Sequence, residues 1–206
     1  MIRRIQQNIL TTLPAWDSHK KMAPPMRKPN PLIPPTVRYS AVCILLFYKQ
    51  KELNTLLIKR AEDGGTHSGQ IGFPGGKLDD KDFSFGYCAL RECEEEIGLD
   101  LKKVKILGSL SKLYIPPSNF ILSPIVCTSI EVKDLSPSPD EVAQIIEVPL
   151  CSLFNNKSKD EQEVWRSDDH TRSMSTPIYK FKDHIIWGAT AMILAELEEI
   201  YISSLV

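Results

Sequence analysis

Residues 75–99, GGKLDDKDFSFGYCALRECEEEIGL, constrain the fold of this chain more than any other segment. A glycine pair and an acidic loop come first. Residues 89–97 follow and are rich in helix-favouring types, and Gly98 comes directly after them as a typical helix end. The sequence therefore predicts a helix that follows a glycine-rich loop and ends at Gly98.

Three glutamates of this helix lie on one face. Glu92, Glu95 and Glu96 stand at positions i, i+3 and i+4, and such like-charged neighbours destabilise a helix by roughly 0.2–0.5 kcal/mol per pair. The opposite face is formed mostly by Leu90, Cys93 and Ile97. A hard divalent cation such as Mg²⁺, which prefers oxygen ligands, would remove the repulsion. A solvated acidic face is the ordinary explanation of such a run, but the preceding loop favours a metal–pyrophosphate site.

The segment resembles the box of the Nudix hydrolases. In that box a glycine is followed by five residues, a Glu, seven residues, an Arg-Glu pair, and then a Glu-Glu pair before a second glycine. This chain has Gly76, then Asp82, then residues 91–99 in the sequence RECEEEIGL. It departs twice, because Asp82 replaces the first Glu and eight residues separate it from Arg91. Both departures resemble the coenzyme A pyrophosphatase branch of the family.

A second motif lies just upstream and resembles the same branch. Its parts are the run LLIKRA at residues 56–61, then His67, Gly69, Gln70 and the sequence FPGG at residues 73–76. Some members carry an Arg where this chain has Gly65. The candidate substrate contacts are Arg60, His67, Gln70, Lys77 and Lys59. Lys59, Arg60 and Lys77 could meet phosphate charges. Ordinary surface lysines and a loop-capping histidine remain the alternatives.

The resemblance implies a mixed β-sheet in an α/β/α sandwich and a metal-dependent hydrolase of diphosphate bonds. It implies Mg²⁺ or Mn²⁺ held by Glu92, Glu95, Glu96 and the backbone carbonyl of Gly76. Arg91 would orient the glutamates. The general base is left open between Glu95 and Glu141.

Coenzyme A or an acyl-coenzyme A is the substrate that the resemblance implies. The products would be adenosine 3′,5′-bisphosphate and 4′-phosphopantetheine or its acyl form. One alternative is an ADP-ribose or nucleoside-diphosphate-sugar pyrophosphatase, which needs the same box and a different pocket. Another is a Nudix-like module that binds a nucleotide without cleaving it, although the presence of all the box acids argues against that function.

Composition fits one enzyme domain and limits the partners. The chain has 206 residues, of which 42% are hydrophobic and 25% charged, with a net charge of −1. It has no basic stripe with interleaved aromatics, so we expect no nucleic-acid partner. It has no membrane-length apolar run and no secretory signal, so we expect a soluble, cytoplasmic protein. The five cysteines lack CxxC spacing and are expected to be reduced core thiols. A homodimer is one option.

We expect an N-terminal arm, residues 1–36, to pack on a Nudix hydrolase domain, residues 37–206. The arm comprises a helix at residues 2–13 and a proline-dense stretch at 22–35. Hairpins are expected at residues 40–59 and 178–187, and single strands at 104–114, 121–130 and 143–148. The polar segment 155–175 is predicted to be a mobile lid or a surface excursion, and residues 188–203 a closing amphipathic helix.

Overall fold

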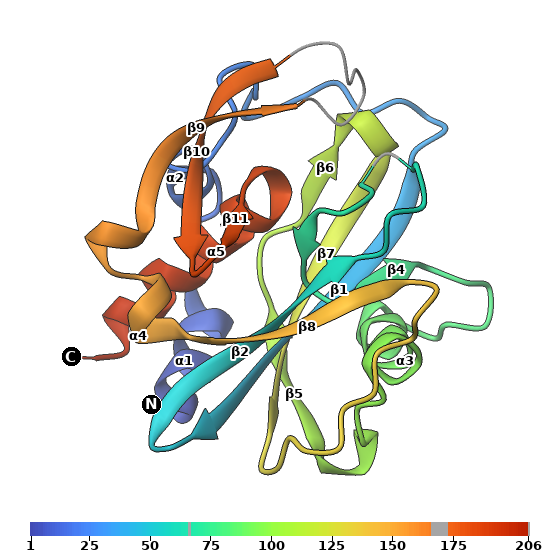
Figure 1. Cartoon of the computed structure of the whole chain (residues 1–206), viewed down its shortest axis with the longest axis vertical. Helices are drawn as coiled ribbons and strands as arrows, with labels where there is room; N and C mark the ends of the chain where they lie inside the picture. The colour runs from blue at the N-terminus through green and yellow to red at the C-terminus, as the bar shows by residue number, and fades with distance from the viewer. Residues whose placement is uncertain (66, 166–172, 206) are drawn as a thin grey trace.

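The structure is a computed structural model that describes residues 1–65, 67–165 and 173–205 of the chain. A mixed sheet lies between helix α3 on one face and helices α1 and α5 on the other (Figure 1). A second, three-stranded sheet contacts α5 through strand β10. This arrangement confirms the predicted α/β/α sandwich with a mixed sheet.

The helices are α1 (Ile2–Thr11), α2 (Trp16–His19), α3 (Phe85–Ile97), α4 (Leu150–Leu153) and α5 (Gly188–Ser203), with short 3₁₀ turns η1 (Leu101–Lys103), η2 (Pro116–Ser118) and η3 (Asn156–Ser158). The large sheet comprises β1 (Arg38–Lys49), β2 (Glu52–Arg60), β3 (Ile71–Gly72), β4 (Gly75–Lys77), β5 (Val104–Ser109), β6 (Leu113–Ile115), β7 (Phe120–Ser129) and β8 (Val142–Pro149). The small sheet comprises β9 (Lys159–Trp165), β10 (Ser173–Phe181) and β11 (His184–Ile186).

The large sheet is organised around the long strand β1. Its central order is β3-β2-β1-β7-β5, with β1 and β7 parallel and the other pairs antiparallel. The predicted hairpin between β1 and β2 turns at Gln50 and Lys51, whose φ angles are 51° and 68°. Two consecutive positive φ values match a tight two-residue hairpin turn. The predicted hairpin between β10 and β11 is also present.

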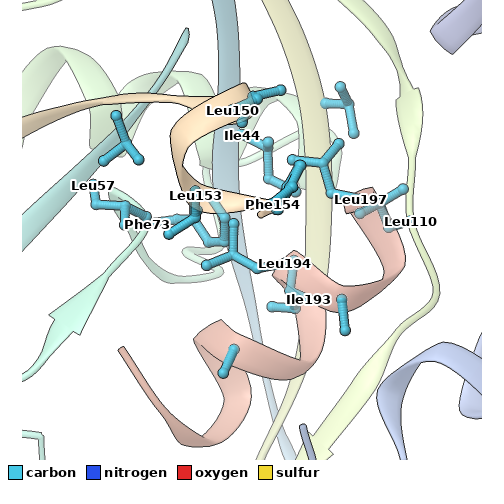
Figure 2. Close-up of a cluster of buried hydrophobic side chains, with 14 of the residues drawn as sticks. Ile44, Leu57, Phe73, Leu110, Leu150, Leu153, Phe154, Ile193, Leu194 and Leu197 are labelled. Atoms are coloured by element: carbon cyan, nitrogen blue, oxygen red, sulfur yellow. The ribbon is translucent and has the colours of Figure 1, made fainter. Parts of the chain in front are cut away.

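Each face of the large sheet buries its own hydrophobic cluster. On one face, α5 packs Leu194 and Leu197 with Ile44 and Leu57 of the sheet (Figure 2). On the other face, the apolar side of α3 packs against a second set of strand residues from β1, β2 and β7. Four cysteines are buried as expected: Cys43, Cys88, Cys93 and Cys127. Cys151 is exposed, which corrects the expectation of a core thiol there.

The N-terminal segment is packed on the sandwich. Helix α1 buries Ile5 and Ile9, and Met22 is buried where the proline-dense stretch begins. Residues 22–35 contain no helix or strand, as their prolines predict. The guanidinium of Arg27 donates a hydrogen bond to the backbone carbonyl of Tyr114. The proline-dense stretch therefore contacts β6.

Three secondary-structure predictions are wrong. Within the segment 155–175, β9 and the start of β10 pair with each other, and only residues 166–172 lie outside the described part. Backbone pairing holds these polar strands together without many apolar side chains. The predicted strand 104–114 is two strands, β5 and β6. Helix α5 is not amphipathic, because nine of its sixteen residues are buried.

Candidate active site

Helix α3 begins four residues earlier than predicted and ends where predicted. The Oγ atom of Ser84, just before the helix, accepts a hydrogen bond from the Tyr87 backbone N–H at 3.1 Å, which caps the first turn. Gly98 ends the helix with φ at 67°, a left-handed conformation that suits glycine. The local sequence thus sets both ends of the helix that carries the glutamates.

Strand β4 brings the glycine pair against this helix. It pairs antiparallel with β1, placing Gly76 opposite Ala41. A Cβ atom added at Gly76 would lie 2.3 Å from the Glu92 Oε2 atom. The close approach of the Glu92 carboxylate to the strand therefore requires glycine at position 76.

Glu96 is the most buried of the three glutamates predicted as metal ligands. Its residue is 2% exposed, and its Oε2 atom accepts a hydrogen bond from the Gly75 backbone N–H at 2.8 Å. The Arg60 Nη1 atom lies 3.7 Å from the Glu96 Oε1 atom. Burial raises the pKa of Glu96 to about 7, against the opposing effects of the Gly75 N–H and Arg60. The carboxyl is thus costly to ionise unless a cation compensates its charge.

Arg91 connects the acidic loop to the glutamates. Its Nε and Nη2 atoms donate to the two carboxylate oxygens of Asp82 at 3.0 and 2.9 Å. Its Nη1 atom lies 2.9 Å from the Glu92 Oε1 atom and 2.8 Å from the Glu95 Oε2 atom. Hydrogen bonding from Arg91 lowers the pKa of Asp82 to about 2. Arg91 is therefore fixed by Asp82 while it holds two glutamates.

Glu141 lies close enough to the glutamates to influence them. It immediately precedes β8, which pairs with β2, and its backbone carbonyl accepts a hydrogen bond from the Ala61 N–H at 2.9 Å. Burial is the main cause that raises the pKa of Glu92, and the negative charges of Glu95 and Glu141 add to it. Four carboxylates from two elements, α3 and the start of β8, thus form one electrostatically coupled group.

This group has the chemistry of a site for a hard cation. Glu96 is a desolvated carboxyl with a raised pKa, and Glu92 is half-buried beside the Gly76 backbone. Oxygen donors of this kind suit Mg²⁺ or Mn²⁺. Among residues 1–65, 67–165 and 173–205, no three His, Cys, Asp or Glu side chains converge as a set of metal ligands. Arg91 holds Glu92 and Glu95, so a cation would compete with it for their oxygens.

The predicted substrate residues divide between the two faces of the sheet. Arg60 faces α3 and the carboxylates, whereas its neighbour Lys59 lines a pocket of about 800 Å³ that none of the carboxylates of α3 lines. Gln70 also lines this pocket, and its Oε1 atom lies 3.1 Å from the His67 Nδ1 atom. Lys77 is exposed on β4, and its backbone carbonyl accepts from the Arg91 Nη2 atom at 3.3 Å.

Asp82 has a role in the candidate site that the sequence does not predict. The sequence identifies it only as a departure from the box, yet its carboxylate accepts hydrogen bonds from the Nε and Nη2 atoms of Arg91. Bidentate pairing of this kind fixes the orientation of a guanidinium. The spacing does indicate a site residue at position 82, because an acidic residue follows Gly76 after five residues, as in the box.

An acidic helix seated on a glycine-rich strand inside an α/β/α sandwich defines a hydrolase of the Nudix type. Sequence comparison with known proteins supports this class. The family model of the NUDIX domain matches residues 37–166. NudL of Photorhabdus laumondii, a Nudix hydrolase described as uncharacterized, is 36% identical over 162 residues, covering 79% of this chain and 84% of NudL.

A longer relative and a solved structure complete the comparison. Nudix hydrolase 15, mitochondrial, of Arabidopsis thaliana is 32% identical over 182 residues, which are 85% of this chain and 61% of that protein. The crystal structure of the Nudix hydrolase RenU from M. smegmatis superposes with a TM-score of 0.56 at 13% identity, covering 81% of this chain and 86% of RenU. That likeness supports the fold. The chain belongs to the NUDIX domain family and is a Nudix hydrolase, which acts on diphosphate bonds.

Nudix hydrolases generally use divalent cations such as Mg²⁺ or Mn²⁺, in keeping with the carboxylates on α3. No helix in the described ranges is long and apolar enough to cross a lipid bilayer.

Proposed function

We propose that this protein hydrolyses the diphosphate bond of coenzyme A or acyl-coenzyme A. Water would add to one phosphorus atom while the bond from that phosphorus to the bridging oxygen breaks. The products would be adenosine 3′,5′-bisphosphate and 4′-phosphopantetheine or its acyl form. The observation that carries the proposal is Asp82, because the two departures from the general box resemble the coenzyme A branch and nonetheless build a fully paired Arg91.

The carboxylates on α3 would hold the cation. Glu92, Glu96 and Glu95, with the Gly76 carbonyl, are the proposed ligands, and Arg91 would position the glutamates. A bound Mg²⁺ or Mn²⁺ would neutralise phosphate oxygens and lower the pKa of the attacking water. The side chains would supply the geometry for this chemistry.

Glu141 is the better of the two proposed general bases. The Glu95 carboxylate is engaged by Arg91 at 2.8 Å. The exposed Glu141 side chain has no ion-pair partner within the part of the chain that the structure describes, and it lies near Glu92 and Glu96. A base needs both access to water and a position beside the reacting group.

We propose substrate contacts on both faces of the large sheet, around the C-terminal end of β2. Arg60 and Lys77 would contact the diphosphate on the α3 side. Lys59, His67 and Gln70 would contact the rest of the substrate through the loop that follows β2. Arg60 has the strongest geometric support, because its guanidinium lies 3.7 Å from the Glu96 carboxylate.

A substrate panel tests the proposal directly. The purified protein is incubated with Mg²⁺ or Mn²⁺ and, in parallel, with coenzyme A, acetyl-coenzyme A, ADP-ribose and a nucleotide sugar, and the products are separated by chromatography. We expect adenosine 3′,5′-bisphosphate from the two coenzyme A compounds. Cleavage of ADP-ribose with coenzyme A left intact would contradict the substrate, and silence on all four would favour a binding module.

A further inference from the structure

The pocket of about 800 Å³ lies on the α5 face of the large sheet, at the end of β2. Its floor is a row across three strands, because Lys59 pairs with Gln144 of β8 on one side and with Ile71 of β3 on the other. Its walls include Gln70, His184 and Trp187. A concave site of this size accommodates a substrate-sized ligand.

The pocket and the carboxylates lie on opposite faces of the sheet at the end of β2. Lys59 lines the pocket, while the next residue, Arg60, reaches Glu96 on the other face. The register of β2 against β8 shifts between these two residues. A substrate whose diphosphate lies beside Glu96 would therefore enter the pocket by passing over the end of β2.

The lining favours a neutral occupant over a phosphorylated one. Lys59 is the only Lys or Arg among the described residues that line the pocket, and its Nζ atom lies 3.9 Å from the Glu62 Oε1 atom. Asp183 adds a second acid. A phosphate group is normally recognised by several cationic donors, which this pocket lacks.

The polar groups that remain in the pocket suit amides. Gln144 is exposed, and its side-chain amide makes no hydrogen bond with residues 1–65, 67–165 or 173–205. A carboxamide both donates and accepts, so it can pair with the N–H or the C=O of an amide ligand. Trp187, Ile71 and Ile185 supply apolar surface beside it.

We propose that this pocket binds the neutral, amide-containing pantetheine arm of the substrate, with Gln144 as a hydrogen-bonding partner and Trp187 as an apolar wall. The inference rests on the proposed hydrolysis of coenzyme A and assigns one half of that substrate to one face of the sheet. The adenosine 3′-phosphate half lies outside the pocket.

Product inhibition separates the two halves of the substrate. Hydrolysis of coenzyme A is measured in the Gln144→Ala variant with 4′-phosphopantetheine and, separately, adenosine 3′,5′-bisphosphate as inhibitors. Loss of neutral hydrogen bonds predicts a rise of roughly 3–10-fold in the KM for coenzyme A and in the inhibition constant of 4′-phosphopantetheine. The kcat and the inhibition constant of adenosine 3′,5′-bisphosphate should stay within about twofold of wild type. Gln7→Ala, the same change at an exposed position of α1, is the matched control.

Three results would overturn the assignment: weaker inhibition by adenosine 3′,5′-bisphosphate alone, equal weakening of both inhibitors, or no change in either. Binding of unphosphorylated pantetheine to the full chain, followed by NMR, gives a readout independent of turnover. If wild type fails to cleave coenzyme A, the proposed function fails, and the pocket is then judged by this binding. Weaker pantetheine binding in Gln144→Ala than in Gln7→Ala supports the pocket, and no binding by wild type refutes it.

Discussion

At Glu96, a carboxyl group is buried with one backbone N–H and one more distant guanidinium as its partners. Its pKa is raised from 4.5 to about 7, chiefly by burial. Between these two pH values the folded protein binds more protons than the unfolded chain. The stability that this group contributes is therefore full below about pH 4.5 and is lost as the pH rises through about 7.

Glu96→Gln should make the metal-free protein more stable at pH 8. The carboxamide can still accept the hydrogen bond from Gly75, and it carries no charge to desolvate. We expect its free energy of unfolding at pH 8 to exceed that of wild type by about 1–3 kcal/mol, with the difference vanishing near pH 4.5. Chemical denaturation in the presence of a chelator at several pH values measures this.

The same variant should lose turnover. Removing a proposed metal ligand is expected to lower kcat by about 100-fold or more. Added Mg²⁺ should raise the melting temperature of wild type and leave that of Glu96→Gln nearly unchanged. Full turnover in a folded Glu96→Gln protein would refute the assignment of Glu96 as a ligand.

Helix α5 carries a second buried carboxylate, which joins three segments of the chain. Glu196 is 0% exposed and accepts hydrogen bonds from the Ala15 N–H at 3.1 Å and from the Ser111 N–H and Oγ at 3.1 and 2.6 Å. The His19 Nε2 atom lies 3.1 Å from its Oε2 atom. Burial alone would raise the pKa of Glu196, but these partners outweigh it and lower the pKa below its ordinary value.

Glu196→Ala should therefore be strongly destabilising, because it leaves buried His19 and three part-buried donors of Ala15 and Ser111 without their acceptor. We expect a loss of about 2–4 kcal/mol in the free energy of unfolding, measured by chemical denaturation at pH 7. Glu199→Ala is the control on the same helix, since Glu199 makes a partly exposed ion pair with Lys21 and its loss should cost less than about 1 kcal/mol. Equal effects of the two changes would contradict a special role for Glu196.

Helices and turns whose own residues favour them were predictable from the sequence. Strands that form only because they pair with a distant strand were not. Helix α3 has its own helix formers and an end at Gly98, and the turn at Gln50 and Lys51 lies between two apolar runs. Strand β9, KDEQEVW, has few apolar residues, and only its pairing with β10 makes it a strand. The sequence predicts an amphipathic helix at α5, but Glu196 and Glu198 are buried because distant residues satisfy their carboxylates.

The residues of the candidate site also fall into those that the local sequence predicts and those that depend on strand pairing. The spacing of Glu92, Glu95 and Glu96 on one helix follows from the sequence. The proximity of Glu141 depends on the pairing of β8 with β2, and a single sequence carries no direct signal of strand register. The opposite directions of Lys59 and Arg60 follow from strand alternation, but which of them faces the carboxylates depends on that same register.

At the scale of the whole molecule, the first 21 residues complete the core. Ile5 is fully buried and Ile9 is 5% exposed, and both belong to the cluster that α5 covers. The same segment supplies His19 and the Ala15 N–H to Glu196. Residues 37–206 alone would therefore expose apolar surface and leave a carboxylate without two of its partners.

A chain that begins at Met22 should be markedly less stable than the full protein. The lost contacts of Ile5 and Ile9 are worth at least about 5 kcal/mol together, which corresponds to a fall of roughly 10–20 °C in melting temperature. Ile5→Ala and the exposed Leu10→Ala, both in α1, form a matched pair for the same measurement. An unchanged melting temperature of the truncated chain would show that the arm is dispensable for folding.

The opposite directions of Lys59 and Arg60 also bear on how such an enzyme changes during evolution. The side chains beside Arg60 belong to one hydrophobic cluster and those beside Lys59 to another, so substitutions on one face leave the packing of the other intact. If the pocket binds the substrate as proposed, mutations that remodel it would leave the packing of the acidic helix unchanged. A lineage with this fold would then be able to exchange one diphosphate substrate for another while keeping the proposed metal-binding glutamates.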